Sequence, residues 1–265
     1  MADPQITSPS NPRIKQLVGL RRRRAREESG STLVEGTEEL ALALEAGVRP
    51  QVVLHCPELM HAAGPPVVER ARSAGAEVVQ LSRAAFEKAA YREGPDGVLA
   101  LVPAPGTGLD DVELGADPLV LVCEGVEKPG NLGAMLRTAD AAGVDLVVAA
   151  DPVTDWGNPN VVRASKGTVF SVPVATATAE QTWPWLRRHG VRVVATTPDT
   201  DTLHTAADLA GGLAVAVGTE KHGLSEAALA AADTRVRIPM SGRVNSLNVA
   251  TSAAIVVYEA LRQRT

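Results

Sequence analysis

The stretch PLVLVCEGVEKPGNLGAMLRTADAAGVDLVVAA, residues 118–150, decides the fold. It begins and ends with runs, LVLV and LVVA, that are apolar throughout instead of alternating with polar residues. Such strands are buried on both faces, which is typical of a parallel sheet covered by helices. Between the runs, apolar residues recur at the i, i+3, i+4, i+7 spacing of an amphipathic helix, at Leu132, Met135, Leu136 and Ala139. The stretch therefore predicts a β-α-β unit of an α/β protein.

The same alternation continues to the end of the chain, so we expect a doubly covered parallel sheet over 117–265. We expect strands at 118–123, 145–149, 191–196, 213–218 and 235–239, and helices at 131–142, 158–166, 179–189, 225–231 and 246–262. The last helix carries two apolar seams, which indicates that something besides its own sheet covers it, such as a second subunit. The seams are Leu247, Ala250, Ala254 and Leu261, and Val249, Ala253, Val256 and Ala260.

A smaller α/β unit is expected over residues 1–102, and the Pro- and Gly-rich stretch 103–116 between the two units reads as a linker. Within the first unit we expect a basic helix over 11–25 that starts at Asn11-Pro12. The other expected helices lie at 38–46, 67–73 and 84–90, and the expected strands at 51–56, 77–81 and 97–102.

Composition excludes several classes of protein. With 265 residues, 45% of them hydrophobic and 22% charged, the chain is neither disordered nor collagen-like nor a coiled coil. No apolar run is long enough to span a membrane, and the N-terminus has no apolar signal core, so we expect a cytoplasmic protein. Two isolated cysteines and five histidines without ligand spacing predict neither disulfides nor a metal site.

Charge is concentrated at the N-terminus of this acidic chain, whose formal net charge is -5. Residues 1–26 hold seven basic residues against one acid, Asp3. This basic head fits a polyanion such as RNA, and it fits a solvated helix face equally well. Because only 3% of residues are aromatic, RNA bound here would rely on arginine more than on stacking. The basic residues are Arg13, Lys15, Arg21, Arg22, Arg23, Arg24 and Arg26.

Three loops follow expected parallel strands, at the edge where open α/β sheets bind ligands. The chain has no GxGxxG, GxxxxGK[ST] or GxSxG motif, so a Rossmann phosphate loop, a P-loop and a hydrolase elbow are excluded. In the first loop, Asn131 suits a helix N-cap, and Arg137 lies about 9 Å further along the helix. The second loop places Glu220 between two glycines, and in the third Asn245, Ser246 and Asn248 crowd a helix start. Each loop alone also fits ordinary turns and caps.

Together these loops carry a resemblance. The motifs NLGAMLRTADAAG, VRASKGTVFSVPV, VGTEKHGLS and IPMSGRVNSLNVATSAAI, in this order, resemble the SpoU (TrmH-type) branch of the SPOUT RNA methyltransferases. Residues 8–102 resemble the N-terminal substrate-binding domain of that family. One departure is Lys128, where many relatives carry an acid. The overall likeness is greatest to members that act on large-subunit rRNA, including antibiotic-resistance methyltransferases.

The resemblance implies a C-terminal trefoil knot, which general rules on chain topology would have excluded, and a homodimer formed through the last helix. It implies S-adenosylmethionine as cofactor and transfer of its methyl group to a ribose 2′-hydroxyl of rRNA. The other functions that remain open are tRNA methylation and RNA binding or assembly without catalysis. The cofactor-binding residues that the resemblance implies are Thr196, Thr197, Val217, Gly218, Thr219, Glu220, Ile238, Met240, Ser246, Leu247 and Asn248.

The resemblance also implies catalytic roles for residues of all three loops. Arg137 would stabilise the developing alkoxide and clamp a neighbouring phosphate, because a guanidinium is too weak an acid to serve readily as a general base. Asn131 would orient the ribose and Arg137. The remaining hydrogen-bonding shell would be completed by Glu220, Ser246 and Asn248.

Overall fold

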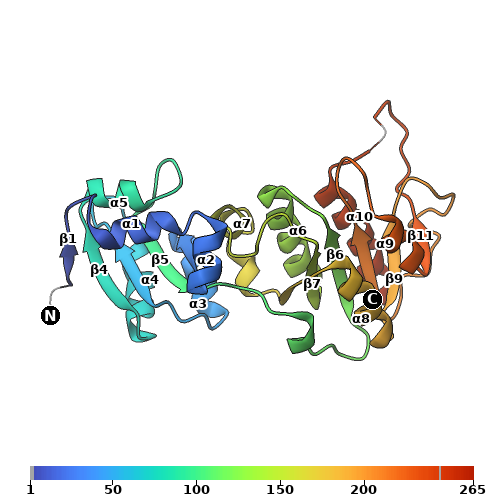
Figure 1. Cartoon of the computed structure of the whole chain (residues 1–265), viewed down its shortest axis with the longest axis horizontal. Helices are drawn as coiled ribbons and strands as arrows, with labels where there is room; N and C mark the ends of the chain where they lie inside the picture. The colour runs from blue at the N-terminus through green and yellow to red at the C-terminus, as the bar shows by residue number, and fades with distance from the viewer. Residues whose placement is uncertain (1–2, 245) are drawn as a thin grey trace. The chain divides into compact units, whose positions relative to one another are not determined.

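A computed structural model describes residues 3–244 and 246–265 of the chain. Its elements fall into two compact units (Figure 1). Unit 1 consists of Met1–Pro105 and Asp155–Ser171, and unit 2 of Gly106–Thr154 and Val172–Thr265. The expected domain limits, 1–102 and 117–265 around a linker, stay a prediction, and the contact pattern departs from them in one segment.

That segment, Asp155–Ser171, groups with unit 1 although it lies between strands of unit 2 in the sequence. It contains α7 (Pro159–Ala164) and the 3₁₀ turn η2 (Thr168–Phe170). The buried Arg26 forms an ion pair with Asp155, and the Thr32 hydroxyl donates to the carbonyl of Gly157. These polar contacts, which a hydropathy pattern does not reveal, explain why the segment packs there.

Unit 1 is built on a five-stranded mixed sheet in the order β1-β4-β3-β5-β2. Strands β1, β4 and β3 are parallel, whereas β5 pairs antiparallel with both β3 and β2. The sequence pattern missed β1 and β2, which are short or carry few consecutive apolar residues. The strands are β1 (Gln5–Ile6), β2 (Ser31–Glu35), β3 (Val52–His55), β4 (Glu77–Leu81) and β5 (Val98–Pro103). The helices are α1 (Pro12–Gly19), α2 (Arg23–Ser29), α3 (Thr37–Glu45), α4 (Gly64–Ser73) and α5 (Arg83–Ala89).

The expected single helix over 11–25 is wrong, because the chain turns between α1 and α2. Helix α1 starts at Asn11, whose side chain accepts from the N–H of Arg13, and it ends at Gly19, a poor helix former. In the turn, the Arg21 guanidinium donates to the carbonyls of residues 88–90 at the end of α5. This capping contact holds the turn in place.

Unit 2 has a six-stranded sheet in the order β11-β9-β10-β6-β7-β8, and every pairing is parallel. The expected parallel α/β fold is confirmed, and β8 is a strand that the pattern missed. The strands are β6 (Leu119–Glu124), β7 (Leu146–Ala150), β8 (Val174–Ala177), β9 (Arg192–Thr196), β10 (Leu213–Val217) and β11 (Thr234–Val236). Its helical elements are η1 (Leu109–Asp111), α6 (Pro129–Ala142), α8 (Ala179–Arg188), α9 (Glu226–Ala231) and α10 (Val249–Arg264).

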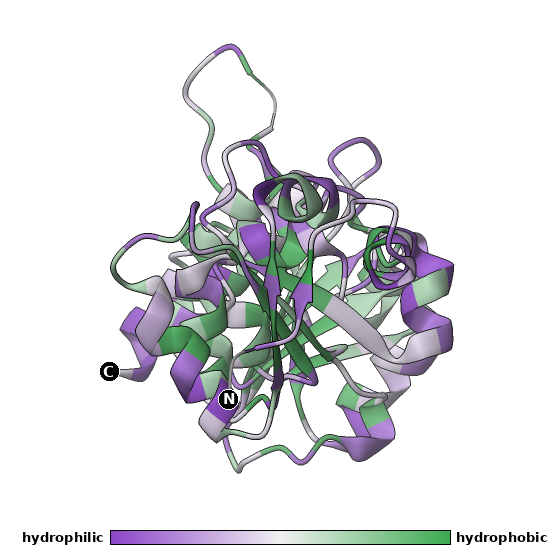
Figure 2. Ribbon diagram, turned by 90° about the vertical axis from the view of Figure 1, so that its left-hand side faces the viewer, coloured by the Kyte–Doolittle hydropathy of each residue, from purple (hydrophilic) through white to green (hydrophobic). Residues whose placement is uncertain are grey.

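Helices cover both faces of the unit 2 sheet. Helices α8 and α9 bury Trp183, Leu186 and Ala228 against one face, together with Val120 and Val122 of β6. Helices α6 and α10 pack against each other over the opposite face. Across the chain, strands are coloured mostly hydrophobic, while helices carry both hydrophilic and hydrophobic residues (Figure 2). No helix among the described residues is long and apolar enough to cross a membrane.

Candidate active site

The site lies at the carboxyl edge of the unit 2 sheet, between β6 and β10. From β6 the chain builds outward through β7 and β8, and it then returns to place β10 on the other side of β6. Such a reversal of strand order is where open parallel sheets bind ligands. The loop after β6 and the loop after β10 therefore meet at this edge, beside the start of α10.

Three polar side chains from these three segments meet in one hydrogen-bonded cluster. Oε1 of Glu220 accepts from Nδ2 of Asn131 at 3.0 Å and from Nδ2 of Asn248 at 2.9 Å. Nδ2 of Asn248 also lies 3.1 Å from Oδ1 of Asn131. We call these three residues the amide–carboxylate cluster. Residues up to 117 positions apart in sequence thus form a single polar centre, as the loop analysis expected.

A fourth residue, Lys128, completes the contacts of the carboxylate. Its ammonium forms an ion pair with Oε2 of Glu220. The Lys128 ammonium, followed by the amide of Asn131, holds the pKa of Glu220 below its ordinary value of 4.5. The carboxylate is therefore charged at neutral pH, which suits it to accept both amide N–H groups.

The expectation that Asn131 caps its helix is wrong. Helix α6 begins two residues earlier, at Pro129, and Lys128 occupies the N-cap position without a side-chain cap. Proline favours the first helical position because its φ is fixed and it has no N–H to satisfy. Asn131 therefore lies inside the first turn, and its side chain is left available for Glu220.

Beside the cluster lies a cavity of about 440 Å³, a size typical of small-molecule sites. Ten of the eleven predicted cofactor-binding residues line it, and the eleventh, Asn248, belongs to the adjacent cluster. The hydroxyl of Thr196 is buried in the cavity wall and has no partner in the described part of the chain. The predicted residues that line the cavity are Thr196, Thr197, Val217, Gly218, Thr219, Glu220, Ile238, Met240, Ser246 and Leu247.

The remaining predicted catalytic residues take different positions. Arg137 lies six residues beyond Asn131 on the exposed side of α6, and its guanidinium has no partner among residues 3–244 and 246–265. Ser246 is exposed at the cavity, whereas Asn248 caps α10 through the N–H of Ala250. Asn245 lies outside the described residues.

One structural anchor of the site was missed by the sequence analysis. Glu124, at the end of β6, is 6% exposed and accepts both the N–H and the hydroxyl of Ser225 at 2.7 Å. Gly125 and Thr219 also approach closely, since a Cβ at position 125 would lie 2.9 Å from the Thr219 methyl. These contacts fix the loop that carries Glu220. The sequence contained one signal for this anchor, since Glu124 is an acid that directly follows an apolar strand.

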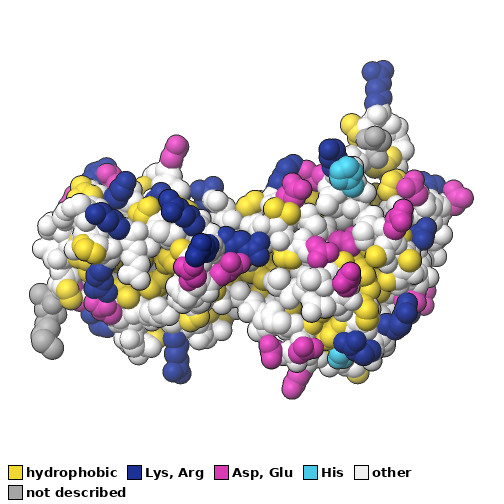
Figure 3. Space-filling view, in the orientation of Figure 1, with side chains coloured by type: hydrophobic (Ala, Val, Ile, Leu, Met, Phe, Trp, Pro, Cys, Tyr) yellow, Lys and Arg dark blue, Asp and Glu magenta, His cyan; other side chains and the backbone are white. Residues whose placement is uncertain are grey.

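In unit 1, Lys and Arg side chains gather over α1 and α2 (Figure 3). Their environments differ from the uniform basic head expected from sequence. Arg26 is 3% exposed and paired with Asp155, so the expectation that it contacts RNA phosphates is wrong. Arg13 pairs with Glu77, and Arg21 caps α5. Lys15, Arg22, Arg23 and Arg24 are also exposed, and the last two form i,i+4 ion pairs with Glu27 and Glu28.

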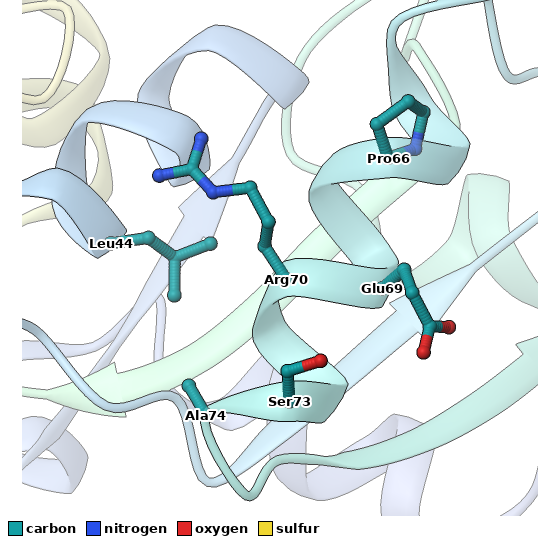
Figure 4. Close-up of a pocket in the computed structure, with 6 residues that line it drawn as sticks. All are labelled: Leu44, Pro66, Glu69, Arg70, Ser73 and Ala74. Atoms are coloured by element: carbon teal, nitrogen blue, oxygen red, sulfur yellow. The ribbon is translucent and has the colours of Figure 1, made fainter.

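A second hollow, of about 450 Å³, lies between α3 and α4 of unit 1 (Figure 4). Leu44 faces Arg70 across it, while Pro66, Glu69 and Ser73 line the α4 side. Arg70 also lies 3.5 Å from a carboxylate oxygen of Glu45. No predicted site residue lines this hollow, so the cavity of unit 2 is the candidate active site. Among the described residues, no group of His, Cys, Asp and Glu could hold a metal ion.

The fold and site define an α/β protein with a cavity of small-molecule size at the topological switch point of its parallel sheet, beside the amide–carboxylate cluster. Comparison with known families identifies the family to which this protein belongs. Residues 118–258 match the SpoU rRNA Methylase family, and residues 11–100 match the MRM3-like substrate binding domain. The chain belongs to the SpoU rRNA methylase family, which confirms the resemblance seen in the sequence.

Individual relatives cover nearly the whole chain. The 23S rRNA (guanosine(2553)-2′-O)-methyltransferase RlmP of Bacillus subtilis is 31% identical, over 96% of this chain and 98% of its own. A crystal structure of an RNA 2′-O ribose methyltransferase is 41% identical, with a TM-score of 0.85 over 98% of both chains. An AdoMet-bound rRNA methyltransferase from Sinorhizobium meliloti is 29% identical, with a TM-score of 0.87 over 97% of both chains.

Proposed function

We propose that this protein transfers a methyl group from S-adenosylmethionine to a ribose 2′-hydroxyl of 23S rRNA. The observation that carries the proposal is the amide–carboxylate cluster, assembled from three distant motifs at the mouth of a cavity. RNA ribose methylation is the activity named for the relatives that align over nearly the whole chain. An rRNA substrate also agrees with a cytoplasmic location.

The cavity fits S-adenosylmethionine, which would supply an activated methyl group. Its volume is adequate, and residues of the loops after β9 and β10 line it. The unpartnered hydroxyl of Thr196 offers a hydrogen bond to a polar ligand inside the wall. The residues present therefore match the predicted cofactor.

Arg137 supplies positive charge next to the reacting hydroxyl. A guanidinium keeps its proton at the pH at which enzymes work, so it acts as a hydrogen-bond donor and not as a base. Its free donors stabilise the oxyanion that develops as the hydroxyl loses its proton, and they clamp the adjacent phosphate. Asn131 keeps one amide N–H beyond the bond to Glu220, and this donor orients the ribose.

Unit 1 holds the RNA in this proposal. Its matching family is a substrate-binding domain, and four exposed basic residues lie on α1 and at the start of α2. These are Lys15, Arg22, Arg23 and Arg24, and they replace the larger set expected from sequence. Their contacts to phosphate contribute affinity without base specificity.

We also propose the homodimer and the trefoil knot that the resemblance implies. The seam Val249, Ala253, Val256 and Ala260 is buried within the chain itself. The other seam stays half-exposed at Leu247, Ala254 and Leu261, next to Tyr258, which is 48% exposed. A second copy packed on α10 would cover these side chains.

Incubation with S-adenosylmethionine labelled on the methyl group tests the proposal. Label should enter 23S rRNA and should not enter tRNA. Label in tRNA alone would show that the substrate is tRNA and not 23S rRNA. Cofactor binding without transfer to any RNA would support a non-catalytic RNA-binding role.

A further inference from the structure

The contacts of Lys128 indicate a role that neither the predicted site nor helix stability explains. Lys128 precedes Pro129 at the start of α6, where the helix dipole disfavours a cation. It makes no capping bond to the helix. A lysine here therefore costs helix stability unless a nearby anion compensates. That anion is the Glu220 carboxylate on the loop after β10.

The two carboxylate oxygens of Glu220 have separate tasks. Oε1 accepts both amides, from Asn131 and Asn248, while Oε2 contacts Lys128. The Glu220 side chain is 33% exposed, so it is not held in place by packing alone. Without the contact between Oε2 and Lys128, the side chain could rotate toward solvent. Proline restricts the backbone of the residue before it, so the direction of the Cα–Cβ bond of Lys128 is constrained at this position.

We propose that Lys128 is a positioning residue for methyl transfer, because it holds Glu220 in the orientation in which Oε1 orders Asn131 and Asn248. The inference rests on the proposed function. A cation here also cancels the charge of Glu220 at the rim, which reduces its repulsion of RNA phosphates.

The first test compares Lys128→Met and Lys128→Arg with the wild type under saturating S-adenosylmethionine and RNA. We expect Lys128→Met to lower kcat at least about tenfold, since a displacement of about 1 Å in a reacting group costs up to about a hundredfold. Lys128→Arg should recover most of this loss. Lys88→Met is the matched control, because Lys88 is an exposed lysine on α5 of unit 1, and it should leave kcat unchanged. The thermal midpoint of all variants should match the wild type.

A charge swap distinguishes two roles for Lys128: positioning the Glu220 carboxylate, and merely linking the loops after β6 and β10. Lys128→Glu combined with Glu220→Lys restores an ion pair, but it places an ammonium donor against two amide donors. The proposal predicts that the double variant stays inactive while its thermal midpoint is retained. Recovery of wild-type kcat by the swap would overturn the proposal, because a structural tether would then be sufficient.

The pH profile of kcat gives a readout that a structural role would not move. The groups facing the Glu220 carboxylate are Lys128, Asn131 and Asn248, and Lys221 and His222 neighbour it on its own loop. Removing the ammonium raises the pKa of Glu220 toward its ordinary value. The decline of kcat at acid pH should therefore begin at higher pH in Lys128→Met than in the wild type.

The outcomes distinguish this inference from the proposed function. A wild-type protein that transfers no methyl group to RNA overturns both. An active wild type with an equally active Lys128→Met variant, and with coinciding pH profiles, overturns the role of Lys128 alone.

Discussion

Asn248 has two tasks that can be separated by substitution. Its side-chain oxygen caps α10 by accepting the N–H of Ala250 at 3.0 Å, and its side-chain nitrogen donates to Glu220 and Asn131. Asn248→Ala removes both tasks. Asn248→Ser keeps an oxygen that can cap the helix, but its side chain is too short to reach the cluster.

The structure sets the expected magnitudes. Loss of an N-cap costs about 1 kcal/mol, which for a chain of this size lowers the thermal midpoint by roughly 2–4 °C. Asn248→Ala should show this loss and Asn248→Ser should not. The two bonds to the cluster are exposed to solvent, so we assign them only about 1–2 kcal/mol together. That free energy corresponds to a kcat about 5- to 30-fold lower in both variants.

Thermal unfolding and methyl transfer to 23S rRNA under saturating conditions measure the two effects separately. The cluster hypothesis requires that Asn248→Ser keeps the wild-type midpoint and loses activity. If Asn248→Ser instead retains wild-type kcat, the amide donors of Asn248 have no part in the reaction. Asn248 would then serve only as the N-cap of α10.

Four further predictions address other parts of the molecule. Arg137→Ala should abolish methyl transfer and leave S-adenosylmethionine affinity intact, as measured by calorimetry; weakened cofactor binding would contradict its assigned role. Arg26→Met should lower the free energy of unfolding by about 3 kcal/mol, because Asp155 loses its buried partner, and should leave the salt dependence of RNA binding unchanged. Neutralising Arg22 should instead reduce that salt slope by about 1, and an unchanged slope would remove it from the RNA surface. Finally, the hydrogen bond from Arg262 lowers the pKa of Glu259 to about 2 from 4.5. Its contribution to stability is present above pH 4.5 and is lost as pH falls toward 2, so Glu259→Gln should flatten the pH dependence of urea unfolding over this range.

The fold of unit 2 could be predicted because its strands are buried on both faces. Runs such as LVLV are typical of a parallel sheet covered on both faces, and the structure pairs them in parallel throughout. Strand β2 was missed because STLVE offers only two strongly apolar residues, and its burial depends on antiparallel pairing with β5. The turn after Gly19 and the packing of Asp155–Ser171 depend on polar contacts between residues far apart in sequence. Periodicity carries no information about such contacts.

The sequence predicted which loops form the site, but it did not predict the individual contacts between their side chains. Parallel strands bring the segments around Asn131, Glu220 and Asn248 to one edge, so sequence alone could place them together. It could not show that Pro129 starts α6 and frees Asn131 from capping. Nor could it show that Lys128 pairs with Glu220, since that contact joins loops 92 positions apart. For the same reason the sequence predicted Arg26 as an exposed cation, since its partner Asp155 is 129 positions away.

Mass spectrometry of nucleosides identifies the atom that receives the methyl group. 23S rRNA methylated by this protein would be digested to nucleosides and each product fragmented across the glycosidic bond. For a ribose 2′-O-methyltransferase, the added 14 mass units remain with the ribose fragment. A base fragment that carries the methyl group, with an unmodified sugar, would contradict ribose methylation.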